Sequence, residues 1–96
     1  MALAVPSAAQ FRAGERILTQ ENPDALLLLA IDSGMYFSLE GVGRQVWELC
    51  DGSHSVEEII DEVCSGYDAP RAVIDADVRS LISELADERL LAPVVA

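Results

Sequence analysis

The sequence predicts an α+β domain in which a three-stranded antiparallel sheet is followed by three helices. Two observations predict this class. Short apolar runs broken by Asn, Pro, Asp and Gly fill residues 16–39, and apolar residues at helical spacing fill residues 42–91. The chain has 96 residues, of which 51% are hydrophobic, and a second core would have too few residues to bury enough surface. We therefore expect a single domain over residues 1–96.

The three strands are predicted at residues 16–20, 25–31 and 35–39. The segment between the first two contains Asn22 and Pro23, which are typical of a tight turn, and Gly34 ends a second turn. The middle run is mostly leucine, but its short length and flanking turn residues favour a central strand with apolar contacts on both faces over a helix. In this meander the third strand, by chain order, lies at an edge.

The third strand runs almost directly into the first helix. In the strand, Met35, Phe37 and Leu39 share one face, while Tyr36 and Ser38 lie on the other. The first helix has an apolar stripe with a tryptophan at its margin, and a left-handed cap is expected at its end. These helix residues are Val42, Val46, Leu49, Cys50, Trp47 and the capping Gly52.

Two further helices follow. Ser55 and Glu58 have the spacing of a capping box, so a second helix begins there and ends near Gly66. Asp68 is the expected N-cap of the third helix, with Pro70 in its first turn. The apolar stripe of the third helix consists of Ile74, Val78, Leu81, Ile82 and Leu85, and Leu90 and Leu91 continue the apolar pattern beyond it.

Residues 1–10 contain Pro6 and small residues without a period, so we expect a loose arm there, although residues 12–15 are compatible with an extended start to the first strand. The chain begins without the basic and apolar regions of a secretory signal, and it has no apolar run of the ~20 residues that span a bilayer. A cytoplasmic location without membrane contact is the expectation.

The formal net charge is −11, from 17 acidic and 6 basic residues. All the basic residues are arginines, and the acids are spread through the helices. Such a surface repels the phosphate backbone, so nucleic acid is not an expected partner. A solvated face explains most of the acids, and a basic peptide or protein partner is the alternative.

No catalytic or metal-binding grouping stands out. Cys50 and Cys64 fall on the apolar faces of two helices, where a thiol packs as a small hydrophobic group, and a disulfide between them remains open. His54 is the one histidine, which is too few for a Cys/His zinc site, and there is no Ser/His/Asp arrangement. We expect a protein that is not an enzyme and that needs neither metal nor cofactor.

Three strands followed by three helices is an arrangement like a winged helix-turn-helix. Within it, the runs YFSLEGVGRQVWELCDGSHSVEEII, DADVRSLISEL and RLL resemble the PqqD-like family. That family's pattern has an aromatic strand, Leu-Asn, a tryptophan helix, Asp-Gly, a Ser/Thr-Val-Glu-Glu-Ile helix start and a last Asp-Val helix. The resemblance covers residues 16–91. One departure is Glu40 in place of the asparagine, and glutamate caps a helix less well.

The resemblance implies a recognition element for precursor peptides that are made ribosomally and then modified. Such elements include standalone partners of the leader peptidase in lasso-peptide biosynthesis, which is the interpretation we prefer, and the carrier of the pyrroloquinoline quinone precursor. In the family, the leader adds as a strand to the third strand and places apolar side chains against the third helix. The corresponding residues here are Met35, Tyr36, Phe37, Ser38, Leu39, Val78, Leu81, Ile82 and Leu85.

The residues themselves agree with this site in one respect, since no Lys or Pro protects the edge at residues 35–39. The opposing interpretation is that these apolar residues are simply core. Expected partners are the leader peptide and a leader peptidase or other modifying enzyme, with the protein a monomer or weak dimer. Two other classes stay open: a DNA-binding winged helix, disfavoured by the acidic third helix, and an adaptor that pairs two edge strands.

Overall fold

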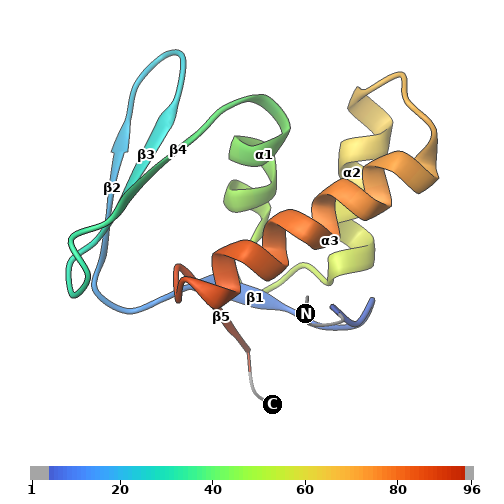
Figure 1. The fold of residues 1–96 in the computed structure, drawn as a ribbon. Coiled ribbons are helices and arrows are strands. Elements are labelled where there is room, and N and C mark those ends of the chain that lie inside the picture. The colour runs from blue at the N-terminus through green and yellow to red at the C-terminus, as the bar shows by residue number, and fades with distance from the viewer. Residues whose placement is uncertain (1–4, 95–96) are drawn as a thin grey trace.

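The computed structural model describes residues 5–94 and has the predicted mixed α+β organisation. Figure 1 shows the three-stranded sheet to one side of the three helices, with α3 running diagonally across α2 and below α1. The elements in chain order are β1 (Phe11–Ala13), β2 (Ile17–Glu21), β3 (Leu26–Ala30), β4 (Tyr36–Leu39), α1 (Gly41–Leu49), α2 (Val56–Gly66), α3 (Arg71–Asp87) and β5 (Leu91–Pro93).

The predicted antiparallel meander is confirmed, with the strand order β2-β3-β4. β3 is the central strand, as expected, but only one of its two apolar faces is fully buried. Leu26, Leu28 and Ala30 are buried, whereas Leu29 is 37% exposed. Helices cover one face of a small sheet, and the described chain has no further layer to cover the other.

A second, two-stranded sheet was not predicted. β1 pairs antiparallel with β5, with Phe11 opposite Pro93 and Ala13 opposite Leu91. The sheet is extended by the Gly14 N–H, which donates to the carbonyl oxygen of Leu90 at 2.8 Å. This pairing explains why the apolar pattern continues past α3: Leu90 and Leu91 are buried in the core beside Phe11.

The first helix buries Val46 and Trp47 and ends at Leu49, with Cys50 as its C-cap residue. Its N-cap residue, Glu40, makes no side-chain capping bond, as its chemistry predicts. Gly52 has the expected left-handed φ of 88°, but it lies in the turn beyond the helix rather than at its cap. There its N–H donates to the Phe11 carbonyl oxygen at 2.9 Å, which fastens the turn to β1.

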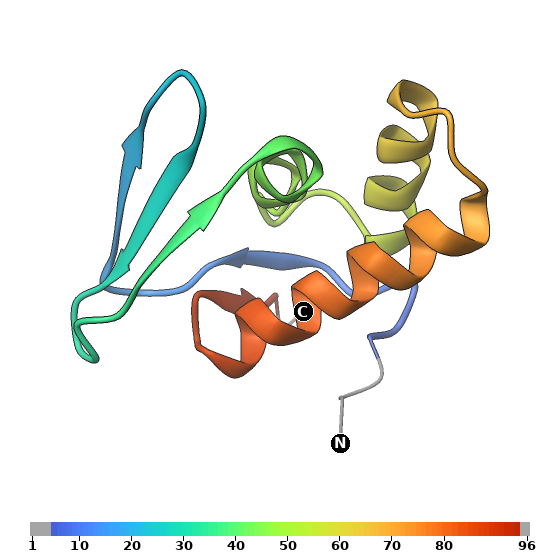
Figure 2. The same ribbon diagram turned by 45° about the horizontal axis from the view of Figure 1, so that its top comes forward.

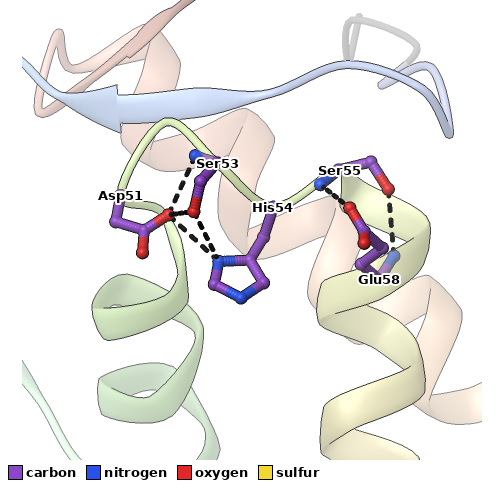
Figure 3. A network of polar contacts seen from close by, with 5 residues as sticks. All are labelled: Asp51, Ser53, His54, Ser55 and Glu58. Atoms are coloured by element: carbon purple, nitrogen blue, oxygen red, sulfur yellow. Dashed lines mark hydrogen bonds and ion pairs between the residues drawn. The ribbon is translucent and has the colours of Figure 1, made fainter.

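The capping box at the start of α2 is confirmed (Figure 3). The Ser55 N–H donates to Glu58 Oε1 at 2.8 Å, and the Glu58 N–H donates to Ser55 Oγ at 3.2 Å. Behind this cap, α2 packs one face into the core, where Val56, Ile59, Ile60 and Val63 are fully buried.

The prediction of a loose arm is wrong for residues 5–10, while residues 1–4 lie outside the described part. The N–H groups of Val56 and Glu57 donate to the carbonyl oxygens of Ala9 and Ser7, at 2.9 and 3.0 Å. Arg79 of α3 also bonds this segment, through the Val5 carbonyl and through Ser7 Oγ at 2.7 Å. The backbone of the arm therefore accepts from N–H groups that the start of α2 leaves without helical partners.

The predicted N-cap of α3 is also wrong. Pro70, not Asp68, is the N-cap residue, with ψ 137° and no side-chain capping bond. Its carbonyl oxygen accepts from the Ile74 N–H at 3.2 Å, so the helix begins at Arg71. Asp68 therefore lies too early in the chain to act as the cap.

Candidate functional site

The β4 strand has one free edge. It pairs with β3 on one side, from Leu26 opposite Leu39 to Leu29 opposite Tyr36, and no strand within residues 5–94 pairs with its other side. The prediction of an edge strand is thus confirmed. Figure 2 shows β4 leading directly into α1, with α3 passing below that junction. Unpaired backbone N–H and C=O groups along such an edge can accept another extended chain.

A groove of about 370 Å³ lies between β4 and α3. Its apolar surface comes from both elements, and carboxylates lie along its helical wall. Its lining residues are Phe37, Ser38 and Leu39 from β4, and Leu81, Glu84, Leu85 and Glu88 from α3 and its C-cap. We call this space the β4–α3 groove.

Five of the nine predicted site residues line the β4–α3 groove: Phe37, Ser38, Leu39, Leu81 and Leu85. Leu39 and Leu85 are also core residues, at 8% and 3% exposure. Leu81 is half-buried, and it lines a second cavity of about 320 Å³ between the start of α1, the C-terminal part of α2 and the N-terminal part of α3. Leu81 and Phe37 are therefore the two half-buried apolar residues of the groove, one on each wall, that can contact a ligand.

The other four predicted residues lie elsewhere. Val78 and Ile82 are buried in the core, at 1% and 0% exposure, so they support the groove from beneath. Met35 precedes β4 and is 48% exposed, and Tyr36 is 74% exposed. Helical periodicity assigns Val78, Leu81 and Ile82 to one apolar stripe of α3. It does not show which of them lie at the margin of the stripe and which lie at its centre.

Glu84 and Glu88 were not predicted as site residues. Their positions, three and seven residues after Leu81, put them on the same side of the helix as that leucine. This spacing is the signal that could have identified them. A carboxylate beside an apolar stripe is ordinarily interpreted as the solvated margin of the helix, so the pattern alone does not single them out.

The outer face of the sheet carries a second apolar surface. Leu18, Leu29 and Tyr36 are opposite one another on adjacent strands, and they are 55%, 37% and 74% exposed. They border a shallow hollow of about 580 Å³, all of whose lining residues are uncharged. Because Tyr36 belongs to β4, this outer face adjoins the same free edge.

A polar network lies in the turn between α1 and α2 (Figure 3). The Asp51 carboxylate accepts from the Ser53 N–H at 2.9 Å and from Ser53 Oγ at 2.7 Å, and it lies 3.0 Å from His54 Nδ1. The hydrogen bonds from Ser53 hold the pKa of Asp51 well below its usual range, and the hydrogen bond to Asp51 raises the pKa of His54. The network orders the turn.

Within residues 5–94, no group of three or more His, Cys, Asp or Glu side chains could hold a metal ion. In the same part of the chain, no helix combines the length and the apolar character needed to cross a membrane.

The two cysteines are free thiols with different surroundings. Cys50 is buried, and burial, with a smaller effect from the Asp51 charge, raises its thiol pKa to about 12. The prediction that both thiols are buried is wrong for Cys64, which is half-buried. It lies near the C-terminal end of α2 and packs against the edge of the core.

We expect Cys50 to react with Ellman's reagent far more slowly in native buffer than in denaturant, because thiolate is the reactive form. The Cys64→Ser variant leaves Cys50 as the single thiol. The Cys50→Ser variant leaves Cys64, which we expect to react faster because it is half-buried. Equal labelling rates for the Cys64→Ser variant in native buffer and in 6 M urea would contradict the burial of Cys50.

Comparison with known proteins agrees with this architecture. The family model described as coenzyme PQQ synthesis protein D (PqqD) matches residues 25–91. The PqqA binding protein of Gluconobacter oxydans is 35% identical over 81 residues, which cover 84% of this chain and 82% of that protein.

Two solved structures share the fold. TbiB1 in complex with the TbiA(β) leader peptide is 28% identical with a TM-score of 0.78, over 88% of this chain and 99% of that one. The PqqD truncation of Methylobacterium extorquens PqqCD, a recognition element for ribosomally synthesised and modified peptides, is 26% identical with a TM-score of 0.74. That match covers 93% of this chain and 95% of the other. The resemblance found in the sequence is confirmed, and the chain belongs to the PqqD family.

Proposed function

We propose that this protein binds the leader segment of a ribosomally synthesised precursor peptide and presents it to a modifying enzyme or leader peptidase, in lasso-peptide biosynthesis. The observation that carries this proposal is the free edge of β4 beside the β4–α3 groove. A leader added to that edge gains main-chain hydrogen bonds along β4, and its alternate side chains enter the groove.

The relatives support the same role. TbiB1 shares the fold and is 28% identical, and its structure holds a leader peptide. A free edge and a groove provide a binding site, and we assign the modification of the peptide to the partner enzyme rather than to this chain. We place this binding in the cytoplasm, where the precursor is translated, and we expect the protein to be a monomer or weak dimer with a winged-helix-like arrangement.

A second candidate is the carrier of the pyrroloquinoline quinone precursor. Its support is the Gluconobacter oxydans relative, which is named a PqqA binding protein and is 35% identical. Both candidates use the same edge and groove, so they differ in the peptide bound and not in the mode of binding. The peptide itself has to separate them.

The test compares two fluorescein-labelled peptides by anisotropy: the TbiA(β) leader, as a lasso-type leader, and a PqqA peptide. We expect saturable binding of the first, and tighter binding of PqqA would select the second candidate. A series of backbone N-methylated leaders then tests strand addition. Methylation should weaken binding at alternate positions only, because every second N–H of an added strand faces β4. Uniform effects along the peptide would contradict strand addition.

A further inference from the structure

We infer that the β4–α3 groove selects leader peptides that carry a lysine or arginine close to their apolar anchor, held by Glu84 and Glu88. This inference rests on the proposed function, because it concerns the ligand of the same groove. Beyond the apolar anchor, it specifies that a second peptide side chain is basic and that Glu84 and Glu88 bind it. The support comes from the position of the two carboxylates, from their electrostatic surroundings and from the geometry of an added strand.

Both carboxylates line the groove together with apolar groups. Glu84 and Glu88 lie one helical turn apart, and both are exposed to solvent, whereas Leu85 between them is buried. A peptide side chain with an apolar stem and a cationic end fits such a wall. The stem can lie against Leu81 and Leu85 while the charge stays at the solvent-facing carboxylates.

The two carboxylates are unfavourably placed in the protein alone. Like charges four residues apart on a helix repel each other. They also lie at the C-terminal end of α3, where the helix dipole favours cations, and the last turn of α3 contains no basic residue. Asp87 adds a third negative charge there. A bound cation would relieve this repulsion, so the arrangement favours a basic ligand.

No arginine of the described chain forms an ion pair with Glu84 or Glu88. The ion pairs within residues 5–94 join Arg16 to Asp32, Arg44 to Glu21, Arg71 to Asp61, Arg79 to Asp75 and His54 to Asp51. Arg89 adjoins Glu88 in the chain, but it makes no ion pair with it. Arg16 and Arg89 line a separate hollow with Glu88 but do not pair with it. We therefore assign the compensating cation to the ligand, and the net charge of −11 attracts a basic ligand from solution.

Strand geometry fixes the spacing. Only every second side chain of a strand added to β4 enters the groove, so the basic residue and the apolar anchor are an even number of positions apart. Along α3, Glu84 and Glu88 lie roughly 4.5 and 10.5 Å beyond Leu81 at a rise of ~1.5 Å per residue. A strand covers those distances in about one to three residues at ~3.3 Å each. We expect a spacing of two positions.

The first experiment selects random 14-residue peptides by mRNA display on three full-length proteins. These are the parent, Glu84→Gln/Glu88→Gln, and the control Glu48→Gln/Glu62→Gln, which removes the same charge from exposed sites on α1 and α2. Peptides selected on the parent and the control should have Lys or Arg enriched two positions from an apolar residue. On Glu84→Gln/Glu88→Gln this enrichment should fall to the library background.

The second experiment uses one selected peptide, labelled with fluorescein, and a version with norleucine in place of the basic residue. The replacement should weaken binding to the parent and the control about fivefold at low salt, as expected for an ion pair at a partly exposed site. It should weaken binding to Glu84→Gln/Glu88→Gln less than twofold. The difference should shrink in 0.5 M NaCl, because salt screens exposed charges.

The outcomes separate the inference from the proposed function. Selected peptides with an apolar anchor but no basic enrichment would overturn the inference and leave strand addition in place. The inference also fails if the control variant loses the basic preference as much as Glu84→Gln/Glu88→Gln does, since the effect would then be general charge attraction. Failure to select any peptide whose binding depends on Leu81 would overturn the proposed function itself.

Discussion

Leu81→Glu is expected to weaken binding of the labelled leader by about 2 kcal/mol or more, which is roughly 30-fold in affinity. Leu81 lines both the β4–α3 groove and the neighbouring cavity, so it meets the peptide at the centre of the proposed site. The substitution removes that apolar contact and places a carboxylate where an apolar side chain of the peptide would remove it from water. Anisotropy titration of the parent and the variant measures the loss.

Leu18→Glu is the matched control. It makes the same chemical change on the outer face of the sheet, where Leu18 is 55% exposed. We expect this variant to bind within twofold of the parent, and thermal melts of both variants show that they remain folded. A folded Leu81→Glu protein that binds like the parent would rule out the groove. If Leu18→Glu loses binding instead, the peptide-binding site lies on the outer face of the sheet.

Gly14→Ala is expected to destabilise the domain by about 2 kcal/mol. A Cβ atom at Gly14 would lie 2.4 Å from the carbonyl oxygen of Arg89 and 3.4 Å from that of Leu90. Both are backbone atoms, so relief requires the β1 and β5 segments to separate. The Gly14 N–H bond to Leu90 would weaken with that movement. For a domain of this size the melting temperature should fall by about 10 °C, as circular dichroism can follow.

Gly66→Ala provides the contrast for this prediction. Gly66 is the last residue of α2, and nothing lies within 4 Å of a Cβ atom built there. Alanine favours the helix over glycine by up to ~1 kcal/mol, so this variant should melt at or slightly above the parent temperature. If Gly14→Ala also has the melting temperature of the parent, Gly14 does not lie close to the Arg89 carbonyl.

The sequence predicted the elements whose patterns are long enough to have a period. The three strands of the meander, the three helices and the capping box at Ser55 all follow from local spacing. β1 and β5 have three residues each, which is too short for alternation to show, and they lie about 80 residues apart. The only sign that β1 pairs with β5 was that Phe11, Leu90 and Leu91 are apolar and need to be buried. A sequence does not show which apolar residues contact one another.

The candidate site was predictable to a similar depth. The free edge followed from chain order, and Leu81 from the apolar stripe of α3. The distinction between Leu81, at the margin, and Ile82, in the core, depends on where α1 and α2 cover the helix. Glu84 and Glu88 became visible as groove residues only when β4 was placed opposite them.

The pairing of β1 with β5 also bears on how such a domain can be joined to other proteins. Because Phe11 lies opposite Pro93, the first and the last strand of the described chain are adjacent, and neither strand lines the β4–α3 groove. A longer polypeptide can therefore hold the domain as an insertion, with one connection following β5 and the other preceding the segment that packs on the start of α2. The same peptide-binding unit can then serve as a separate protein or as a built-in part of the enzyme it supplies.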